Sequence, residues 1–298
     1  MHEGQHTISV GQVAALVGQQ FPDWRGLPVR AVASSGTVNA LFRIGDGLVA
    51  RFPLLGEDAS AVRRQLLREA ERMQELASST RVPVPRPVAL GEAGHGYPLP
   101  WSVQTWLTGV DAFADDPSDS TPFARDLATL ILELRDADTR GRNFDGSGRG
   151  GLLPAHDAWV ESCFQASGEL VDVPALRRLW ERWRVLPVSG PDVMSHGDLI
   201  PGNVLVRGGR LAGLLDGGGF SPADPALDLV AAWHLLDDEP RRVFREQLGV
   251  DELEWARGEA WALEQAIGAG WYYRDTNPAM SRMAVRTLGR LLRAESHP

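Results

Sequence analysis

The sequence predicts an α+β fold with a small N-terminal lobe built on an antiparallel sheet and a larger, mainly helical C-terminal lobe. Three observations support this prediction. The first third of the chain alternates short β-rich runs with Gly-containing turns. Most of the remainder carries apolar residues at helical spacing. A length of 298 residues with 43% hydrophobic content allows each lobe a core of its own. We place the lobes at residues 1–107 and 108–298.

In the N-terminal lobe we expect a leading helix over residues 7–20, where Thr7 and Ser9 are candidate N-caps. A long helix with one apolar side is predicted for residues 58–76. Alternating apolar runs between turn residues predict the strands, which are expected at 29–34, 40–44, 48–52, 88–90 and 99–107. The order of these elements favours a sheet with one helix inserted between its strands.

In the C-terminal lobe the acidic, Ser/Pro-rich residues 111–120 predict an exposed linker, and residues 140–151 predict a Gly-rich loop. Apolar residues at helical spacing predict the helices, which are expected at 123–134, 156–164, 173–183, 226–236, 241–248, 253–267 and 281–292. Most of their apolar residues are interpreted as core.

The stretch 194–220 carries the pattern that indicates a reaction. It reads HGDLIPGN from His196 to Asn203, and then two apolar strands joined by a Gly-Gly turn lead to Asp216. Kinase-type phosphotransferases hold a base and two metal ligands in this order and spacing. Pairing of the two strands, 204–206 and 211–215, is expected to bring Asn203 and Asp216 together.

Phosphoryl transfer needs a positioned acceptor hydroxyl, divalent cations across the phosphates and a carboxylate near the attacking oxygen. We therefore assign Asp198 as the base, and Asn203 and Asp216 as ligands of Mg²⁺. His196 is interpreted as a buried hydrogen-bonding brace rather than an acid–base group. Asp228 is expected either to bond the backbone of the loop that carries Asp198 or to act only as a helix N-cap.

Arg51 lies on the third predicted strand, where a kinase fold carries a phosphate-binding lysine. The chain contains no lysine, so all 30 Lys+Arg residues are arginines and this role falls to Arg51. Glu69, near the middle of the helix over 58–76, is the predicted ion-pair partner that would orient the guanidinium. Glu71 and Glu75 are the competing carboxylates. An exposed strand arginine is the alternative interpretation.

Two further segments are candidates for contact with a nucleotide. Backbone N–H groups of a Ser/Gly-rich connection can bind phosphates, which makes Ser34, Ser35 and Gly36 candidates, although an ordinary tight turn explains them equally well. The strand over 99–107 would form the hinge between the lobes, and an adenine ring would bind backbone groups around Gln104 and Trp106.

HGDLIPGNVLV followed by LLDGGGFSPADPALDLVAAW resembles the aminoglycoside phosphotransferase family. The resemblance extends from residues 34–52 through the predicted hinge to residues 271–278. It implies a protein-kinase-like two-lobe fold, ATP or GTP as phosphate donor, Mg²⁺, and Asp198, Asn203 and Asp216 in the roles assigned above.

The acceptor is expected to be a small molecule. The short distance in sequence between Asp216 and Asp228 leaves no room for the segment that docks a peptide in protein kinases. Tyr272, Tyr273 and Asp237 are candidate acceptor contacts in the large lobe, although aromatic runs of this kind are more often core.

Composition restricts the class of partner and the compartment. The formal net charge of -9 argues against nucleic acid and favours a cationic small molecule, although solubility alone also explains it. The single Cys163, the lack of an apolar leader and the lack of a long apolar run predict a cytoplasmic protein that does not enter a membrane. The sequence does not address the oligomeric state.

The expected function is therefore an ATP- or GTP-dependent O-phosphotransferase whose acceptor is an antibiotic such as an aminoglycoside. Kinases of macrolides, of tuberactinomycin-type peptides, or of a metabolite such as an amino alcohol or a sugar are alternatives within the same class. From a different class, a catalytically weak nucleotide-binding sensor is suggested by the missing lysine and by the glycines that follow Asp216.

Overall fold

The computed structural model describes residues 5–32 and 38–296. The chain divides into two compact units, each with segments that are distant in sequence. The first unit consists of Met1–Ser78, Pro83–Thr108 and Asp216–Gly218, and the second consists of Ser79–Val82, Gly109–Leu215 and Gly219–Pro298. The inclusion of three residues after position 215 in the first unit was not predicted from the sequence.

The first unit contains a five-stranded antiparallel sheet in the order β1-β2-β3-β5-β4. Its strands are β1 Val29–Val32, β2 Asn39–Ile44, β3 Leu48–Pro53, β4 Pro87–Gly91 and β5 Trp101–Thr105. β3 lies in the middle of the sheet, and its Arg51 pairs with Leu41 on one side and with Ser102 on the other. This central position fixes the backbone of Arg51 from both neighbouring strands.

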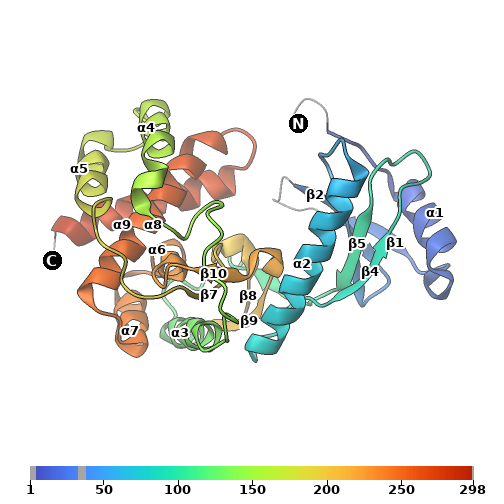
Figure 1. The fold of residues 1–298 in the computed structure, drawn as a ribbon, viewed down its shortest axis with the longest axis horizontal. Helices are drawn as coiled ribbons and strands as arrows, with labels where there is room; N and C mark the ends of the chain where they lie inside the picture. Colours follow the sequence, from blue (N-terminus) through green and yellow to red (C-terminus); the bar gives the residue numbers. More distant parts are fainter. Residues whose placement is uncertain (1–4, 33–37, 297–298) are drawn as a thin grey trace. The chain divides into compact units, whose positions relative to one another are not determined.

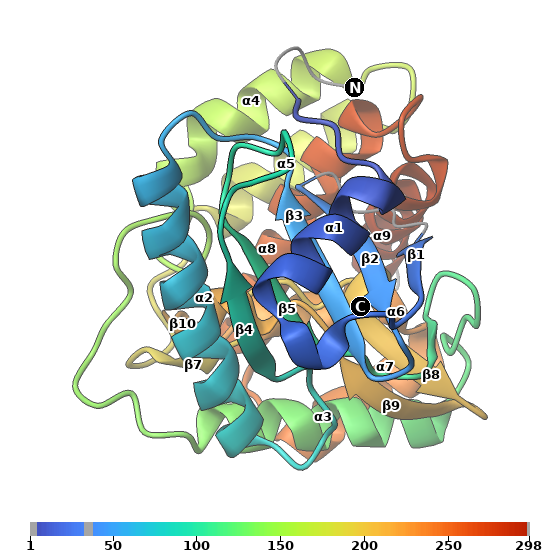
Figure 2. The ribbon, with the colours of Figure 1, turned by 90° about the vertical axis from the view of Figure 1, so that its right-hand side faces the viewer.

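Two long helices accompany this sheet, α1 Val10–Gln20 and α2 Ala59–Ser79. α1 begins with a capping box formed by Ser9 and Gln12, so Ser9 is the N-cap among the two candidates. α1 lies across the strands in Figure 2, and β4 and β5 lie between α1 and α2 in Figure 1. Apolar residues of α1, such as Leu16, pack with Phe52 and Trp101 in the core of the unit.

Trp101 explains one glycine in this core. Its ring stacks on Phe52 with centroids 4.7 Å apart. A Cβ atom at Gly91, the paired residue on β4, would lie 2.1 Å from the Trp101 ring. Only glycine therefore leaves room for the indole at this point of the sheet.

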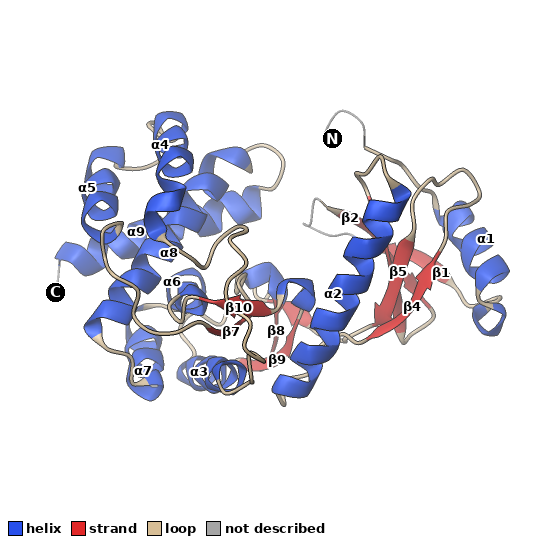
Figure 3. Ribbon diagram, viewed as in Figure 1, coloured by secondary structure: helices blue, strands red, loops and turns tan. Residues whose placement is uncertain are grey.

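The second unit is mainly helical, with short strands among the helices (Figure 3). Its helices are α3 Thr121–Arg135, α4 Asp157–Ala166, α5 Val173–Trp183, α6 Val230–Leu235, α7 Asp238–Leu248, α8 Glu252–Tyr272 and α9 Pro278–Ser296. The strands are β6 Val110–Asp111, β7 Val193–Ser195, β8 Val204–Arg207, β9 Arg210–Leu214 and β10 Ser221–Ala223. They form two small antiparallel sheets, β6-β8-β9 and β7-β10.

Helix α8 is the central element of the second unit. It contacts α4, α5, α6 and α9. Its buried residues occur on all sides of the helix and include Trp261, Leu263 and Ile267, which is the pattern of a helix surrounded by other helices. Within the ranges 5–32 and 38–296, no helix combines the length and apolar character needed to cross a membrane.

The α+β fold class with an antiparallel-sheet first part and a helical second part is confirmed. The prediction of an exposed linker at residues 111–120 holds only in part, since residues 114–116 and 119 are exposed whereas the others are not. Val110 and Asp111 pair with β8, Ala112 is 4% exposed, and Ser118 is 8% exposed. The Asp111 carboxylate accepts the N–H groups of the two residues that follow Ala112, so the acidic residues here form turns that attach to the small sheet.

Candidate active site

The loop between β7 and β8 carries the predicted base, and Asp228 holds its backbone. The N–H groups of His196 and Gly197 donate to the two carboxylate oxygens of Asp228, at 2.9 and 2.8 Å. Asp228 is 3% exposed and lies in the 3₁₀ turn Leu227–Leu229. Gly197 has φ 78°, a conformation that glycine adopts without steric cost. Asp228 thus makes the backbone contact that the sequence led us to expect.

His196 ties the same loop to the end of the β8–β9 hairpin. Its side chain is almost fully buried, and its Nε2 donates to the carbonyl oxygen of Leu215 at 2.8 Å. Because a carbonyl only accepts, Nε2 carries a hydrogen. Nδ1 is buried, and the described residues offer it no hydrogen-bond partner. These contacts favour the interpretation of His196 as a structural brace.

Asp198 has partners on both carboxylate oxygens. Its Oδ2 accepts from Nδ2 of Asn203 at 2.9 Å, and the same Nδ2 also donates to the main-chain oxygen of Asp198. Its Oδ1 accepts from Nε2 of Gln265 at 2.5 Å and from Nη2 of Arg149 at 3.2 Å. The Asp198 side chain remains 36% exposed, so it is still open to solvent.

Arg149 and Gln265 were not predicted as site residues. Arg149 comes from the Gly-rich loop, between Gly148 at φ 70° and Gly150 at φ 115°. A Cβ atom at Gly150 would lie 2.7 Å from the Cβ atom of Ala223, so the loop approaches β10 too closely for a larger residue. An arginine between two glycines was the available sequence signal. Gln265 gave no signal, because α8 was interpreted only as core.

The predicted hairpin connects Asn203 to the residue before Asp216. Val204 pairs with Leu214, and the N–H of Leu215 donates to the main-chain oxygen of Asn203 at 2.7 Å. Asp216 follows directly with φ 57°, in the left-handed region that residues with a side chain seldom adopt. This conformation costs on the order of 1 kcal/mol and is typical of functional positions.

Arg51 pairs with Asp216 rather than with Glu69. In the first unit, Nη2 of Arg51 lies 2.9 Å from Oδ1 of Asp216, and Nη1 lies 3.5 Å from Oε1 of Gln104. Glu69 instead accepts a hydrogen bond from Gln65, at 2.8 Å. The predicted Arg51–Glu69 ion pair is therefore wrong in this structure. The sequence argument considered only the carboxylates of the long helix, whereas the first unit also contains the segment that begins at Asp216.

Glu69 contacts that segment in a different way. A Cβ atom at Gly218 would lie 3.1 Å from Cγ of Glu69, and one at Gly217 would lie 2.3 Å from Cδ2 of Leu76. The two glycines after Asp216 therefore lie directly against helix α2. Any side chain at position 217 would displace Leu76, which is 1% exposed.

A family model matches most of the chain. The model of the APH family, described as the phosphotransferase enzyme family, matches residues 30–293. The chain belongs to this family. The resemblance found in the HGDLIPGN stretch and the predicted enzyme class, a phosphotransferase, are thereby confirmed.

Solved structures of family members share the fold along nearly the whole chain. The GDP complex of wild-type aminoglycoside 2'-phosphotransferase-IIIa is 18% identical, with a TM-score of 0.69, and the match covers 97% of this chain and 100% of the other. The macrolide 2'-phosphotransferase MphH from Brachybacterium faecium is 21% identical, with a TM-score of 0.60 and coverages of 93% and 97%. The gentamicin complex of APH(2")-IIa is 17% identical, with a TM-score of 0.59 and coverages of 96% and 97%. No curated protein matches the chain.

In the strand predicted as the hinge of this phosphotransferase, two main-chain N–H groups already donate hydrogen bonds to other residues of the first unit. The N–H of Thr105 donates to the oxygen of Arg86 at 2.9 Å, and that of Trp106 donates to the oxygen of Gly47 at 2.8 Å. Gln104 is 9% exposed and faces Arg51. A nucleotide base bound here would have to use carbonyl oxygens of this segment or N–H groups beyond residue 106. Ser34, Ser35 and Gly36 lie outside the described residues.

The three residues predicted to contact an acceptor differ in their surroundings. Tyr272, at the end of α8, is 43% exposed and packs edge-on against Tyr273 with ring centroids 4.8 Å apart. Asp237 accepts from Nη2 of Arg290 at 2.5 Å and from Oγ of Ser118 at 3.2 Å. Burial raises the pKa of Asp237, but the hydrogen bond and charge of Arg290 outweigh burial and lower this pKa below its ordinary value. The Asp237 side chain is nevertheless 52% exposed, and contact of Asp237, Tyr272 or Tyr273 with an acceptor remains a prediction.

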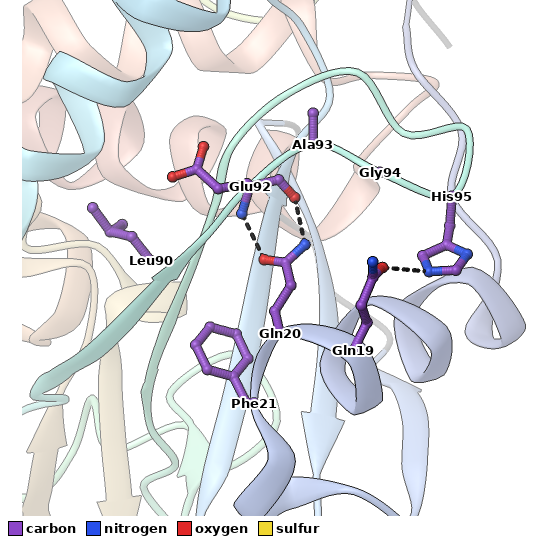
Figure 4. A pocket seen from close by; sticks show the side chains of 8 residues that line it. All are labelled: Gln19, Gln20, Phe21, Leu90, Glu92, Ala93, Gly94 and His95. Atoms are coloured by element: carbon purple, nitrogen blue, oxygen red, sulfur yellow. Dashed lines mark hydrogen bonds between the residues drawn. The ribbon is translucent and has the colours of Figure 1, made fainter.

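A shallow groove in the first unit contains none of the predicted site residues (Figure 4). The side-chain amide of Gln20 pairs with the N–H and carbonyl of Glu92, and Gln19 bonds the ring of His95. Because these polar groups bond one another, the groove offers few free groups to a ligand, and we assign it no role.

The residues proposed for Mg²⁺ fit the chemistry of that ion. Asn203 directs its Nδ2 to Asp198, which leaves its amide oxygen as the group for a cation. Mg²⁺ prefers oxygen ligands and is usually held by one or two protein groups together with substrate phosphates and water. The part of the chain that the structure describes contains no cluster of three His, Cys, Asp or Glu side chains that could hold a metal ion.

Proposed function

We propose that this phosphotransferase transfers the γ-phosphoryl group of ATP or GTP to a hydroxyl group of a small molecule, and that an antibiotic such as an aminoglycoside is the acceptor. The observation that carries the proposal is the carboxylate of Asp198, which is oriented by Asn203 within the HGDLIPGN loop and is still open to solvent. The same loop contains the proposed metal ligand, as phosphoryl transfer requires.

The proposed step breaks the bond between the γ-phosphorus and the oxygen that bridges it to the β-phosphate. It forms a bond between this phosphorus and the acceptor oxygen, and the acceptor proton passes to Asp198. Asp198 positions the hydroxyl and then holds that proton, while Asn203 prevents rotation of the carboxylate. Bound Mg²⁺, held by Asn203 and Asp216, would neutralise charge on the phosphate oxygens. Arg51 would contact the phosphates as the cation on β3.

The choice of acceptor rests on the solved relatives. One of these structures contains kanamycin together with GDP, and another contains gentamicin. Further structures are complexes with GDP or with ADP. Macrolide 2'-phosphotransferases show a similar degree of structural similarity, so a macrolide is the next candidate. The net charge of -9 favours the cationic aminoglycosides as acceptors.

The test is a screen for release of ADP and GDP in the presence of kanamycin, gentamicin, streptomycin, a macrolide, choline and simple sugars. We expect turnover with at least one antibiotic, and a loss of about a thousandfold or more in Asp198→Ala. Asp119→Ala removes an exposed carboxylate of the second unit and serves as the matched control. Wild-type turnover in Asp198→Ala would refute the assignment of the base. Turnover with choline or a sugar alone would replace the antibiotic with a metabolite.

A nucleotide sensor is a second candidate, and the Arg51–Asp216 ion pair is the observation that favours it. A cation that holds the proposed metal ligand competes with Mg²⁺ for the same carboxylate. Mg²⁺-dependent hydrolysis of ATP or GTP that disappears in Asp216→Asn would exclude the sensor. Tight nucleotide binding without hydrolysis or transfer would support it.

A further inference from the structure

Three hydrogen bonds connect Asp198 to the buried core of the second unit. Nε2 of Gln265 lies 2.5 Å from Oδ1 of Asp198, and Oε1 of Gln265 lies 3.2 Å from Nε2 of His234. The other ring nitrogen of His234, Nδ1, lies 2.9 Å from Oγ1 of Thr287. The relay therefore runs from Thr287 through His234 and Gln265 to the proposed base.

The donors of this relay all point in one direction. A carboxylate only accepts, so Gln265 must direct its NH₂ group to Asp198 and its oxygen to His234. That oxygen accepts from Nε2–H of His234, which leaves Nδ1 bare and able to accept from the Thr287 hydroxyl at 2.9 Å. The main-chain oxygen of Trp233 is a second acceptor for this hydroxyl, at the longer distance of 3.3 Å. Burial lowers the pKa of His234 to about 3, so the ring is neutral at neutral pH. A neutral ring has one donor and one acceptor, as the relay needs.

The relay is anchored where the unit is least accessible. His234 on α6 and Thr287 on α9 are both 0% exposed, and Gln265 lies on the central helix α8. Three helices thus determine which way the Gln265 amide faces. A reversed amide would place two acceptors against each other at Asp198 and would lose the bond to His234.

We propose that Gln265 is a positioning residue for the phosphoryl-transfer reaction, and that His234 and Thr287 orient its amide. The inference rests on the proposed role of Asp198 as the base. Asn203 holds Oδ2 and Gln265 holds Oδ1, so the carboxylate cannot rotate about its Cβ–Cγ bond without losing a hydrogen bond. Arg149 also contacts Oδ1, at 3.2 Å, but its side chain is 31% exposed. Gln265 makes the shorter contact with Oδ1, at 2.5 Å, and brings no charge of its own.

The experiment compares Gln265→Leu and Gln265→Glu with the wild type in full-length protein. Hydrolysis of ATP and GTP by water in the presence of Mg²⁺ is measured, so that no acceptor needs to be known. We expect kcat to fall about tenfold to a hundredfold in Gln265→Leu while KM for the nucleotide changes less than about threefold. Gln265→Glu, the isosteric variant, is expected to be slower still, because it places a second carboxylate against Asp198. If Gln265 only filled space, the isosteric Gln265→Glu would instead have a higher kcat than Gln265→Leu.

Two further variants test the relay and control for loss of stability. Thr287→Val keeps the shape but removes the hydroxyl, and we expect a smaller fall in kcat, of about twofold to fivefold. Gln247→Leu is the matched control, since Gln247 also makes two side-chain hydrogen bonds in the second unit, to Arg125 and Thr129. Its kcat should equal that of the wild type even if the melting temperature falls.

Two results would overturn the inference without affecting the proposed function. One is wild-type kcat in Gln265→Leu while Asp198→Asn is inactive. The other, which does not depend on turnover, is a crystal structure of Gln265→Leu in which the Asp198 carboxylate keeps its wild-type orientation. A rotated carboxylate supports the inference. Full activity in Asp198→Asn would instead refute the assignment of the base itself.

Discussion

Arg51 on β3 and Asp216 after β9 form an ion pair, with Nη2 and Oδ1 2.9 Å apart, although 165 positions separate them in the sequence. The guanidinium is mostly buried, with 15% of its side chain exposed, whereas the carboxylate is 53% exposed. Asp216 is also held at φ 57°. In the proposed reaction Arg51 contacts the phosphates and Asp216 binds Mg²⁺. The ion pair between them therefore has to loosen when a nucleotide with Mg²⁺ binds.

Substitution of Arg51 should therefore change nucleotide affinity more than stability. For Arg51→Gln we expect KM for ATP or GTP to rise about tenfold, because a charge-assisted phosphate contact is lost. Arg51→Lys should recover only part of this, since an ammonium cannot bind bidentately. The free energy of unfolding should change by less than about 1 kcal/mol, because the Asp216 carboxylate that loses its partner is 53% exposed and can be hydrated. Arg30→Gln, on the exposed strand β1, is the matched control.

Gly217→Ala should destabilise the protein by about 1–3 kcal/mol, because the added methyl group would overlap Leu76 on α2. Chemical denaturation measures this change. Gly47→Ala is the control, since a Cβ atom there would meet no atom within 4 Å. Leu76→Ala in the Gly217→Ala background should show a favourable coupling energy of about 0.5 kcal/mol or more. Simple additivity of the two changes would contradict the proposed overlap.

Arg257→Leu should cost about 3–5 kcal/mol of stability, because it leaves the buried carboxylate of Asp224 without its cation. Arg257 and Asp224 are 1% and 2% exposed at their side chains, and Nη1 of Arg257 also binds the carbonyl oxygen of Leu186 at 2.9 Å. Replacement of Asp224 with Asn in the same variant should restore part of the loss. Arg182→Leu breaks an exposed pair with Glu295 and should cost less than about 1 kcal/mol. Equal costs for the two arginines would contradict this account.

Stability should fall with pH below neutrality through His234. Its pKa is about 3 in the folded protein, because of burial, and about 6.5 in the unfolded chain. The unfolded state therefore takes up a proton between these values while the folded state does not. This one group should remove about 2 kcal/mol between pH 7 and pH 5. Denaturation of wild type and His234→Gln at both pH values measures the difference, and parallel pH dependences would refute it.

Most of the fold could be predicted because its helices and strands carry regular apolar periodicity. Helix α5 begins and ends at the predicted residues, and the β8–β9 hairpin follows from its apolar strands and Gly-Gly turn. The linker at 111–120 was partly misjudged, because composition reports polarity, not the two-residue pairing of β6 with β8.

The candidate site could be predicted where its residues belong to the pattern from His196 to Asp228. Asp198 and Asn203 lie in one loop, and their hydrogen bond follows from local geometry. Arg149 and Gln265 reach Asp198 from a loop and a helix that are distant in sequence, and both residue types are common on ordinary surfaces. The wrong choice of Glu69 as the partner of Arg51 has the same origin, because tertiary structure brought in a carboxylate that periodicity cannot reveal.

The assignment of Asp216–Gly218 to the first unit has a consequence for protein engineering. A fragment of residues 1–108 contains the whole five-stranded sheet and α2, yet it lacks the carboxylate that pairs with Arg51 and the glycines that cover Leu76. In chimeras that exchange N-terminal lobes between relatives, residues 216–218 should therefore travel with the donor of the lobe, and a single crossover near residue 108 would separate parts that pack together.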